Sequence, residues 1–333
     1  MAGAGSRQAG REGVHIGRRH ALAGLAGLAT AALLGCGRGG NGAPPRIFTL
    51  AYDIWPGYYS AALADALGLL AEAGLGLRMI APGTTDRMLA EFHAGRHDLI
   101  ACSIGDIIPM AGRSRDIAIV LSSDESAGGD QVFQRRGFDP GSAGLIRIGT
   151  DFSGFGELFM RDYLAQAGLA DRPLQWLHVD ASEVRYALDA GSIDIGNTWE
   201  PYASATARAG HRRVFDSSQT PALITQVVVA KRRLIEAERP RLAAFCAAWL
   251  EATERWLADV PAGQKTIEAH LGLEPGAASL AGIRLHTLAD NRRLLDGEAP
   301  ALLPVLERFR TFFAERGEDP GDLRFLLEAD LLP

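Results

Sequence analysis

Aromatic and acidic side chains gather in two short stretches that also contain proline. Residues 52–60 read YDIWPGYYS and place Trp55 and Tyr58 on either side of a Pro-Gly pair, and residues 199–202 read WEPY. Loops between secondary-structure elements are usually rich in small polar residues. An aromatic face beside a carboxylate attracts an organic cation, because the ring quadrupole and the negative charge act together. These residue types therefore favour the binding of a small polar molecule.

Carboxylates crowd the same parts of the chain and bear on the charge of that molecule. They are Asp53, Asp106, Asp124, Asp130, Glu157 and Glu200. We expect Asp53 and Asp106 to act as helix caps or to face solvent. The others would repel a purely anionic ligand such as nitrate. The sequence therefore favours an amine-bearing ligand or a zwitterion of the taurine kind.

Two glycine-containing stretches, near residues 57–60 and 154–157, are predicted to begin helices. The unpaired N–H groups and the dipole at a helix start attract anions. Gly57, Gly154 and Gly156 would let a ligand approach the backbone closely. The alternative interpretation is ordinary turn chemistry, which would suffice for either start alone. Two such starts facing each other across a cleft favour an anion site.

Patterns typical of catalysis, cofactors or metals are incomplete. Residues 154–159 read GFGELF and lack the third glycine of a dinucleotide-binding motif, because Phe159 stands there. His93 and His97 are four residues apart, but Gly95 interrupts the helix that would bring them together. No order of Ser, His and Asp or of Cys and His indicates a nucleophile. We therefore expect no metal, no cofactor and no catalytic residue.

The elements that position these residues alternate between apolar, β-rich runs and helical patterns. The predicted strands are residues 47–52, 77–80, 98–103, 117–122, 145–150, 193–197 and 222–230. The predicted helices include residues 60–73, 85–94, 155–167 and 181–190. Alternation of this kind predicts an α/β fold with parallel-type sheets flanked by helices.

The first half of the chain also recurs in the second half. AGL at residues 73–75 recurs 94 residues later. AGRHDLI at residues 94–100 recurs as AGSIDIG 96 residues later. Two matches in the same order at nearly one offset suggest two similar βαβαβ units.

The repeat predicts which loops meet. In open α/β sheets, ligands bind outside the carboxyl ends of the strands. The corresponding loops are residues 53–58 and 103–106 in the first unit and 150–156 and 197–202 in the second. Trp55 is then expected to face Phe155 and Trp199 across a cleft between two lobes.

The first 35 residues have the pattern of an export signal. Arg18 and Arg19 precede an uncharged Ala/Leu/Gly stretch that ends before Cys36. LLGC at residues 33–36 resembles a bacterial lipobox, in which the cysteine is lipidated and becomes the mature N-terminus. The alternative is an incidental cysteine in an ordinary signal, and Sec and twin-arginine export both stay open. We expect a lipid-anchored protein on the periplasmic side of the inner or outer membrane, with residues 36–45 as a tether.

Charge and composition argue against other classes of protein. Without the first 35 residues, the chain would keep 298 residues and a net charge of −9 instead of −6. That balance argues against nucleic acid, whose binding depends on Lys and Arg contacts to phosphates. No second apolar run approaches the length of a membrane span. Cys102 and Cys246 lie in apolar patterns and are expected to be buried free thiols.

The order of three short motifs resembles a known family. WPGY, GGD at residues 128–130 and WEPY resemble the nitrate/sulfonate/taurine family of ABC-transporter substrate-binding proteins, over roughly residues 46–320. The resemblance implies a type II periplasmic-binding fold, a solute held between two lobes, and delivery to a permease with its ATPase. It implies these ligand-binding residues: Trp55, Pro56, Gly57, Tyr58, Ser103, Asp106, Asp124, Gly129, Asp130, Phe155, Gly156, Glu157, Trp199, Glu200 and Tyr202.

The chain is expected to cross twice between the lobes. Residues 46–138 would begin the first lobe, residues 139–222 would form the second, and residues 223–333 would return to complete the first. A hinge is predicted near residues 137–143 and 220–224. Helical spacing makes the tryptophans of the return segment core residues.

These features predict a monomeric, non-enzymatic solute-binding protein of an ABC importer. A periplasmic sensor with the same ligand-binding lobes is one alternative. Another is a protein that binds or makes a thiamin-pyrimidine precursor, since an enzyme of that pathway resembles this family. That enzyme uses a cysteine-rich iron segment, and the present sequence, with three cysteines, has none.

Overall fold

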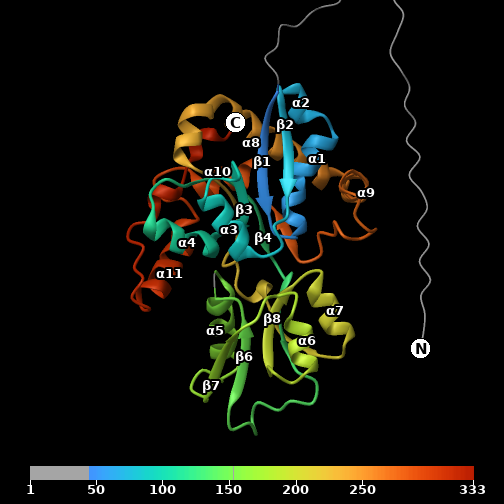
Figure 1. Ribbon diagram of the computed structural model, residues 1–333, viewed down its shortest axis with the longest axis vertical. Coiled ribbons are helices and arrows are strands. Elements are labelled where there is room, and N and C mark those ends of the chain that lie inside the picture. The colour runs from blue at the N-terminus through green and yellow to red at the C-terminus, as the bar shows by residue number, and fades with distance from the viewer. Residues whose placement is uncertain (1–44, 153) are drawn as a thin grey trace, which may run out of the picture. The chain divides into compact units, whose positions relative to one another are not determined.

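The computed structural model describes residues 45–152 and 154–333. The predicted export signal, the predicted lipidation site Cys36 and nearly all of the predicted tether lie outside these residues. Within the described part, no helix is both long and apolar enough to cross a membrane. The described chain forms two lobes, each built on one β-sheet with helices packed against it (Figure 1).

The first lobe contains a six-stranded sheet. Its strands are β1 (Arg46–Tyr52), β2 (Leu75–Ile80), β3 (Leu99–Ser103), β4 (Ala118–Ser126), β10 (Thr225–Ala230) and β11 (Ile283–Leu285). They lie in the order β11-β4-β10-β3-β1-β2. β1 is parallel to β2 and β3, whereas β10 is antiparallel to β3 and β4. β3 and β10 are buried along their whole length, as expected for central strands covered on both faces.

The second lobe contains a five-stranded sheet. Its strands are β5 (Asp130–Gln134), β6 (Ile146–Thr150), β7 (Leu174–His178), β8 (Ile195–Trp199) and β9 (Arg212–Asp216). They lie in the order β7-β6-β8-β5-β9. β6 is parallel to β7 and β8, and β5 is antiparallel to β8 and β9.

Helices cover both sheets and fill the return segment. They are α1 (Ser60–Ala66), α2 (Leu69–Glu72), α3 (Thr85–His93), α4 (Ile104–Arg113), α5 (Gly156–Gln166), α6 (Val184–Asp189), α7 (Tyr202–Arg208), α8 (Arg232–Ala258), α9 (Val260–Leu271), α10 (Leu288–Leu295) and α11 (Leu303–Ala314). Short 3₁₀ turns are η1 (Pro56–Tyr59), η2 (Ser217–Gln219), η3 (Arg324–Leu326) and η4 (Ala329–Leu331). On α8, Trp249 and Trp256 are buried, as their helical spacing predicts. Cys102 and Cys246 are buried free thiols, which confirms that prediction.

The repeated sequence pieces make the same contacts in both lobes. In the first lobe, Asp98 accepts a hydrogen bond from Thr49 N at 2.8 Å and donates its own N–H to Thr49 O. In the second, Asp194 accepts from Arg147 N at 3.0 Å and donates its N–H to Arg147 O. Each aspartate thus ties the start of the third strand of its unit to the first strand. The predicted pair of βαβαβ units is confirmed by this geometry.

The sheets are mixed rather than wholly parallel. The chain leaves the first lobe through β4 and β5 and returns through β9 and β10, and this path places β5 and β10 antiparallel to their neighbours. The sequence patterns do not indicate β5, β7, β9 or β11. These strands are short, and β7, β9 and β11 carry exposed polar residues that break the apolar signal.

The first crossing between the lobes lies earlier than predicted. β4 ends at Ser126 in the first sheet, and β5 begins at Asp130 in the second. Residues 130–138 therefore belong to the second lobe, and the predicted hinge segment at residues 137–143 lies inside that lobe. The second crossing runs from the end of β9 to the start of β10 and includes the predicted boundary after residue 222.

Candidate functional site

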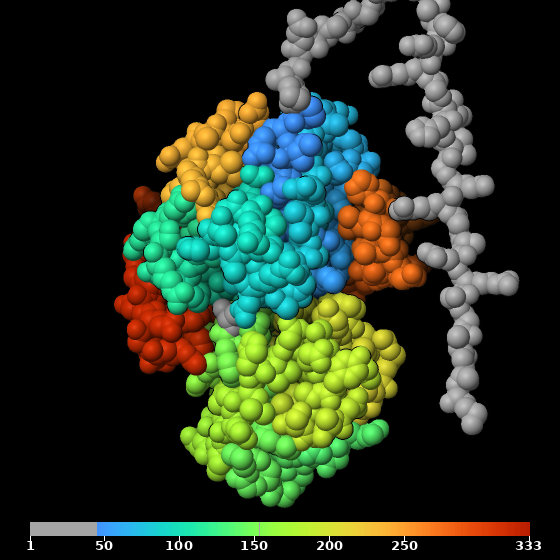
Figure 2. Space-filling view, viewed as in Figure 1, coloured from blue at the N-terminus to red at the C-terminus, as the bar shows by residue number. Residues whose placement is uncertain are grey.

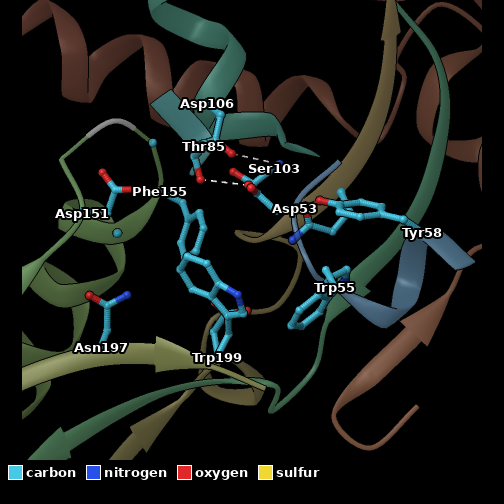
Figure 3. A pocket seen from close by; sticks show the side chains of 14 residues that line it. Asp53, Trp55, Tyr58, Thr85, Ser103, Asp106, Asp151, Phe155, Asn197 and Trp199 are labelled. Carbon is cyan, nitrogen blue, oxygen red and sulfur yellow. Dashed lines mark hydrogen bonds between the residues drawn. The ribbon is translucent and has the colours of Figure 1, made fainter. Parts of the chain in front are cut away.

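A pocket lies between the two lobes and encloses about 470 Å³ of space between atoms, part of which is open to solvent. Its lining residues are drawn in Figure 3: Asp53, Trp55, Tyr58, Thr85, Ser103, Asp106, Asp130, Asp151, Gly154, Phe155, Gly156, Asn197, Trp199 and Gln226. Most of them follow or end the parallel strands β1, β3, β6 and β8. Because the carboxyl ends of these strands face each other across the lobes, one pocket collects loops from both repeats.

Eight of the predicted ligand-binding residues line this pocket. They are Trp55, Tyr58, Ser103, Asp106, Asp130, Phe155, Gly156 and Trp199. Six further lining residues are absent from the predicted ligand-binding set: Asp53, Thr85, Asp151, Gly154, Asn197 and Gln226. The signal for Gln226 was present, since it is the polar residue that interrupts an apolar strand. Asn197 likewise lies two residues before Trp199 on β8, so both side chains share one face of the sheet.

The aromatic residues form the walls of the pocket. Trp55 Nε1 donates to Asp124 Oδ1 at 2.9 Å, and the Tyr58 hydroxyl donates to Gln226 Oε1 at 2.5 Å. Phe155 and Trp199 lie next to each other, with ring centroids 6.1 Å apart (Figure 3). The expected meeting of Trp55 with Phe155 and Trp199 in one interlobe pocket is therefore observed.

Two of the predicted ligand carboxylates have partners outside the pocket. Both oxygens of Glu157 accept from Arg316, at 2.6 and 2.5 Å, and Arg161 adds a bond of 2.9 Å. These residues line a separate open groove beside the pocket. Glu200 accepts from the backbone N–H and the hydroxyl of Ser204, at 3.2 and 3.0 Å, in the first turn of α7. Both carboxylates are thus paired with groups of the protein itself.

The other predicted residues that do not line the pocket support its wall or adjoin it. Asp124 is fully buried behind Trp55. Gly129 packs on the same ring, since a Cβ there would lie 2.7 Å from Trp55 Cη2. Pro56 starts the buried turn η1. Tyr202 lines a smaller neighbouring hollow together with Asp53 and Trp199.

The glycines at the helix starts are covered by the protein's own oxygen atoms. A Cβ on Gly57 would lie 2.1 Å from Asp124 Oδ2, and one on Gly154 would lie 1.7 Å from Asp106 Oδ1. A Cβ on Gly156 would lie 2.6 Å from the carbonyl oxygen of Asp151. The space predicted for a ligand at these backbones is therefore filled. Asp124 and Asp106 thus fill the space beside Gly57 and Gly154, and a backbone carbonyl fills the space beside Gly156.

Burial raises the pKa of the carboxyl groups that line the pocket. It raises the pKa of Asp130 to about 7, with a further contribution from Asp124. It raises the pKa of Asp53 to about 6, against a hydrogen bond from Thr85 that lowers it. Burial likewise holds the pKa of Asp106 well above its usual range, and Asp151 and Asp53 raise it further. No Lys, Arg or His is among the described residues that line the pocket.

Three buried oxygen atoms in the pocket lining have no hydrogen-bond partner. They are Ser103 Oγ, Asp130 Oδ2 and Asn197 Oδ1. Asp130 is 1% exposed and Asn197 is 2% exposed. A buried acceptor without a partner costs about 1–3 kcal/mol, so such atoms are rare unless a ligand or water satisfies them. These atoms indicate where hydrogen-bond donors of a ligand would sit.

The model of the NMT1-like family matches residues 42–270, and the chain belongs to that family. A comparison with curated proteins found no match.

Solved structures share the fold at low sequence identity. The ligand-binding component of an ABC-type import system from Staphylococcus aureus, with zinc bound, has a TM-score of 0.69 at 14% identity, covering 86% of this chain and 97% of that one. The alkanesulfonate-binding protein SsuA from Xanthomonas axonopodis pv. citri, bound to MOPS, has a TM-score of 0.65 at 17% identity, covering 88% and 99%. The desulfurization enzyme DSZB has a TM-score of 0.58 at 16% identity, covering 85% and 97%. The predicted type II periplasmic-binding fold is confirmed, and both binding proteins and an enzyme use it.

Proposed function

We propose that this chain is the solute-binding component of an ABC importer and delivers an amine-bearing solute to a permease and its ATPase. The acidic, interlobe pocket carries this proposal. Its lining combines carboxylates, aromatic faces and three unpartnered buried oxygen atoms. An ammonium group supplies the donors that these acceptors need and the positive charge that the carboxylates need.

The geometry favours the cationic part of a ligand over a sulfonate part. Carboxylate oxygens of Asp124 and Asp106 lie against Gly57 and Gly154 near the two helix starts, where they would repel an anion. The described lining has no guanidinium or ammonium group to hold a sulfonate. A taurine-like zwitterion is thus the second candidate, supported only by the fold shared with SsuA.

Binding without chemical conversion agrees with the residues in the pocket. The described lining contains no Cys or His. Cys102 lies in β3, is fully buried, and has a pKa held well above its usual range by burial, so it is a poor nucleophile. A sensor with the same lobes would bind its ligand by the same physics, and a reading frame for a permease beside this one would favour transport.

The experiment is a thermal-shift screen of amines, sulfonates, nitrate and pyrimidines, followed by titration calorimetry of each compound that stabilises the protein. A specific ligand at 100 times its dissociation constant should stabilise the protein by about 2.7 kcal/mol. For the best amine, Asp130→Asn should cost about 1.5–3 kcal/mol of affinity, the range for a hydrogen bond to a charged group.

Asp171→Asn is the matched control, because Asp171 is exposed and lies outside the pocket. Its affinity should equal that of the wild type. If only anionic or neutral compounds bind, or if folded Asp130→Asn binds the amine as well as the wild type does, the proposed ligand class is wrong.

A further inference from the structure

Carboxyl groups of the second lobe lie at two separate positions along the edge of its sheet. Asp151 follows β6, Asn197 lies in β8, and Asp130 begins β5. β8 lies between β6 and β5 in the sheet. Neighbouring strands are about 4.8 Å apart, so the backbones of Asp151 and Asp130 are separated by two spacings, about 10 Å. A single small ion cannot contact both residues.

The facing edge of the first lobe has the same arrangement. Its strands run β4-β10-β3-β1. Asp124 lies on β4, Gln226 on β10, Asp106 in the first turn of α4 after β3, and Asp53 after β1. Acidic residues thus lie toward both ends of this edge, and the neutral Gln226 lies between them.

The two edges are aligned, so that the acidic positions meet in two groups. Asp106 Oδ1 lies against Gly154, in the loop that carries Asp151, since a Cβ on Gly154 would be 1.7 Å away. Asp53 and Asp151 both raise the pKa of Asp106, so these three residues form one end of the pocket, the first acidic end. Trp55 donates to Asp124 and packs on Gly129, which precedes Asp130, and Asp124 raises the pKa of Asp130, so Asp124 and Asp130 form the second acidic end. Figure 3 shows Phe155 and Trp199 side by side in the space between Asp151 and Trp55.

Positive charge does not balance either end from within the pocket. The described lining has no basic residue. Arg284 lowers the pKa of Asp124, but its guanidinium is paired with Glu125 at 2.8 Å and Asp290 at 3.2 Å. In the described chain, no group of three His, Cys, Asp or Glu side chains is arranged to hold a metal ion. His178 Nδ1 lies 3.9 Å from Asp151 Oδ1, outside the lining, and carries charge only when protonated. An organic cation would supply positive charge inside the pocket.

We propose that the ligand is a short aliphatic dication, with one cationic nitrogen at the first acidic end and the other beside Asp130 and Asn197. The unpartnered atoms Asp130 Oδ2 and Asn197 Oδ1 accept hydrogen bonds from the second nitrogen. Asp130 pairs with Trp199, and Val132 pairs with Asn197, in the β5–β8 register. Residues directly opposite each other share a face of the sheet, as do residues two apart on one strand, so the side chains of Asp130 and Asn197 lie on the same face. A dication matches the charge at both ends, whereas a monoamine leaves one end uncompensated.

The spacing sets the length of the ligand. Each nitrogen would lie about 2.8 Å from a carboxylate oxygen, on the side toward the middle of the pocket. With the backbones of the acidic ends about 10 Å apart, roughly 4–5 Å remains between the nitrogens, which a chain of about two to four carbon atoms spans, the longest of them bent. The aromatic walls contact this chain. The inference rests on the proposed function, since it names the solute class of the same pocket.

The test compares three compounds of one chain length by titration calorimetry at pH 8: 1,4-diaminobutane, n-butylamine and 4-aminobutanoate. We expect the diamine to bind about 10- to 100-fold more tightly than either other compound, the range for one charge-assisted hydrogen bond. Asp130→Asn should reduce diamine affinity to about that of n-butylamine for the wild-type protein. Asp53→Asn tests independently how far the first acidic end contributes to diamine affinity. Asp171→Asn should leave the affinity for all three compounds unchanged.

The outcomes separate this inference from the proposed function. If n-butylamine binds as tightly as the diamine, the dication is wrong and the amine-binding function stands. If 4-aminobutanoate binds most tightly, the zwitterion is the better ligand. If none of the three binds while another class does, both the inference and the proposed ligand class fail. Circular dichroism melts establish that each variant is folded.

Discussion

An ion pair between the lobes is expected to set how readily the pocket opens. Glu157 lies on α5 of the second lobe, and Arg316 follows α11 in the return segment. Figure 2 shows the segment around α11, in red, beside the second lobe. A second pair, Arg308 with Asp162, joins the same two helices. Both pairs must break if α11 stays with the first lobe while the lobes separate.

The size of the effect follows from the burial of the two partners. The Glu157 side chain is 5% exposed and receives two charge-assisted bonds from Arg316, whose side chain is 39% exposed. Two such bonds could contribute several kcal/mol if fully buried, but solvent screens the guanidinium and Arg161 still neutralises Glu157 in the variant. Arg316→Met should therefore shift the closed form by about 1–2 kcal/mol, a factor of about 5–30 in its population relative to the open form.

The assay is pulsed electron–electron double resonance on ligand-free protein with spin labels at Glu72→Cys and Ala165→Cys. Both positions are exposed, one on each lobe, and Cys102 and Cys246 are buried from the label. Arg316→Met should add a population at longer distance. Arg316 makes no contact with the ligand, but Arg316→Met should also weaken binding, because affinity falls in proportion to the lost population of the closed form.

Arg310→Met is the matched control. Arg310 lies on α11, shortly before Arg316, but pairs with Glu307 and Asp319 in its own segment. Its distance distribution should equal that of the parent protein. If Arg316→Met also leaves the distribution unchanged, the ion pair does not control opening, and α11 moves with the second lobe.

Three further predictions concern the pocket and the membrane. Trp199→Ala should weaken ligand binding and reduce the ligand-dependent compaction seen by X-ray scattering. Trp249→Ala, in the core of the first lobe, should instead cost about 3–5 kcal/mol of stability and leave closure unchanged. A Trp199→Ala variant that only destabilises the fold would show that Trp199 is a core residue. Burial raises the pKa of Asp130 to about 7 in the ligand-free protein. The stability that the protonated form contributes is therefore present at low pH and is lost as the pH rises toward 7, so between pH 5 and 8 the melting temperature should fall while the affinity for an amine increases. An affinity that does not change with pH would contradict this. Wild-type protein should be acylated at Cys36 and fractionate with membranes, and processed but unacylated protein in the soluble periplasmic fraction would contradict the lipobox.

Local patterns in the sequence were sufficient to predict the α/β class, the repeat and the loops that meet in the pocket. Apolar runs such as residues 98–103 have the period and composition of strands, and these depend on neighbours in the sequence. The repeat then placed Trp55, Phe155 and Trp199 at strand ends that face each other. Ligands bind where parallel strands end, so the meeting of these loops follows from strand order alone.

Only the tertiary structure decided which partner each polar group takes. Glu157 pairs with Arg316, which lies 159 residues away in the sequence, and Asp124 on β4 lies against Gly57 in the turn η1. A carboxylate binds the nearest cation or N–H group in space, and a sequence without an alignment does not reveal that neighbour. The path through β5 and β10 was hidden for the same reason, since the sheet to which a short strand belongs depends on long-range pairing. The sequence therefore determined where the pocket forms, and tertiary contacts decided which of its acidic groups remain to meet a ligand.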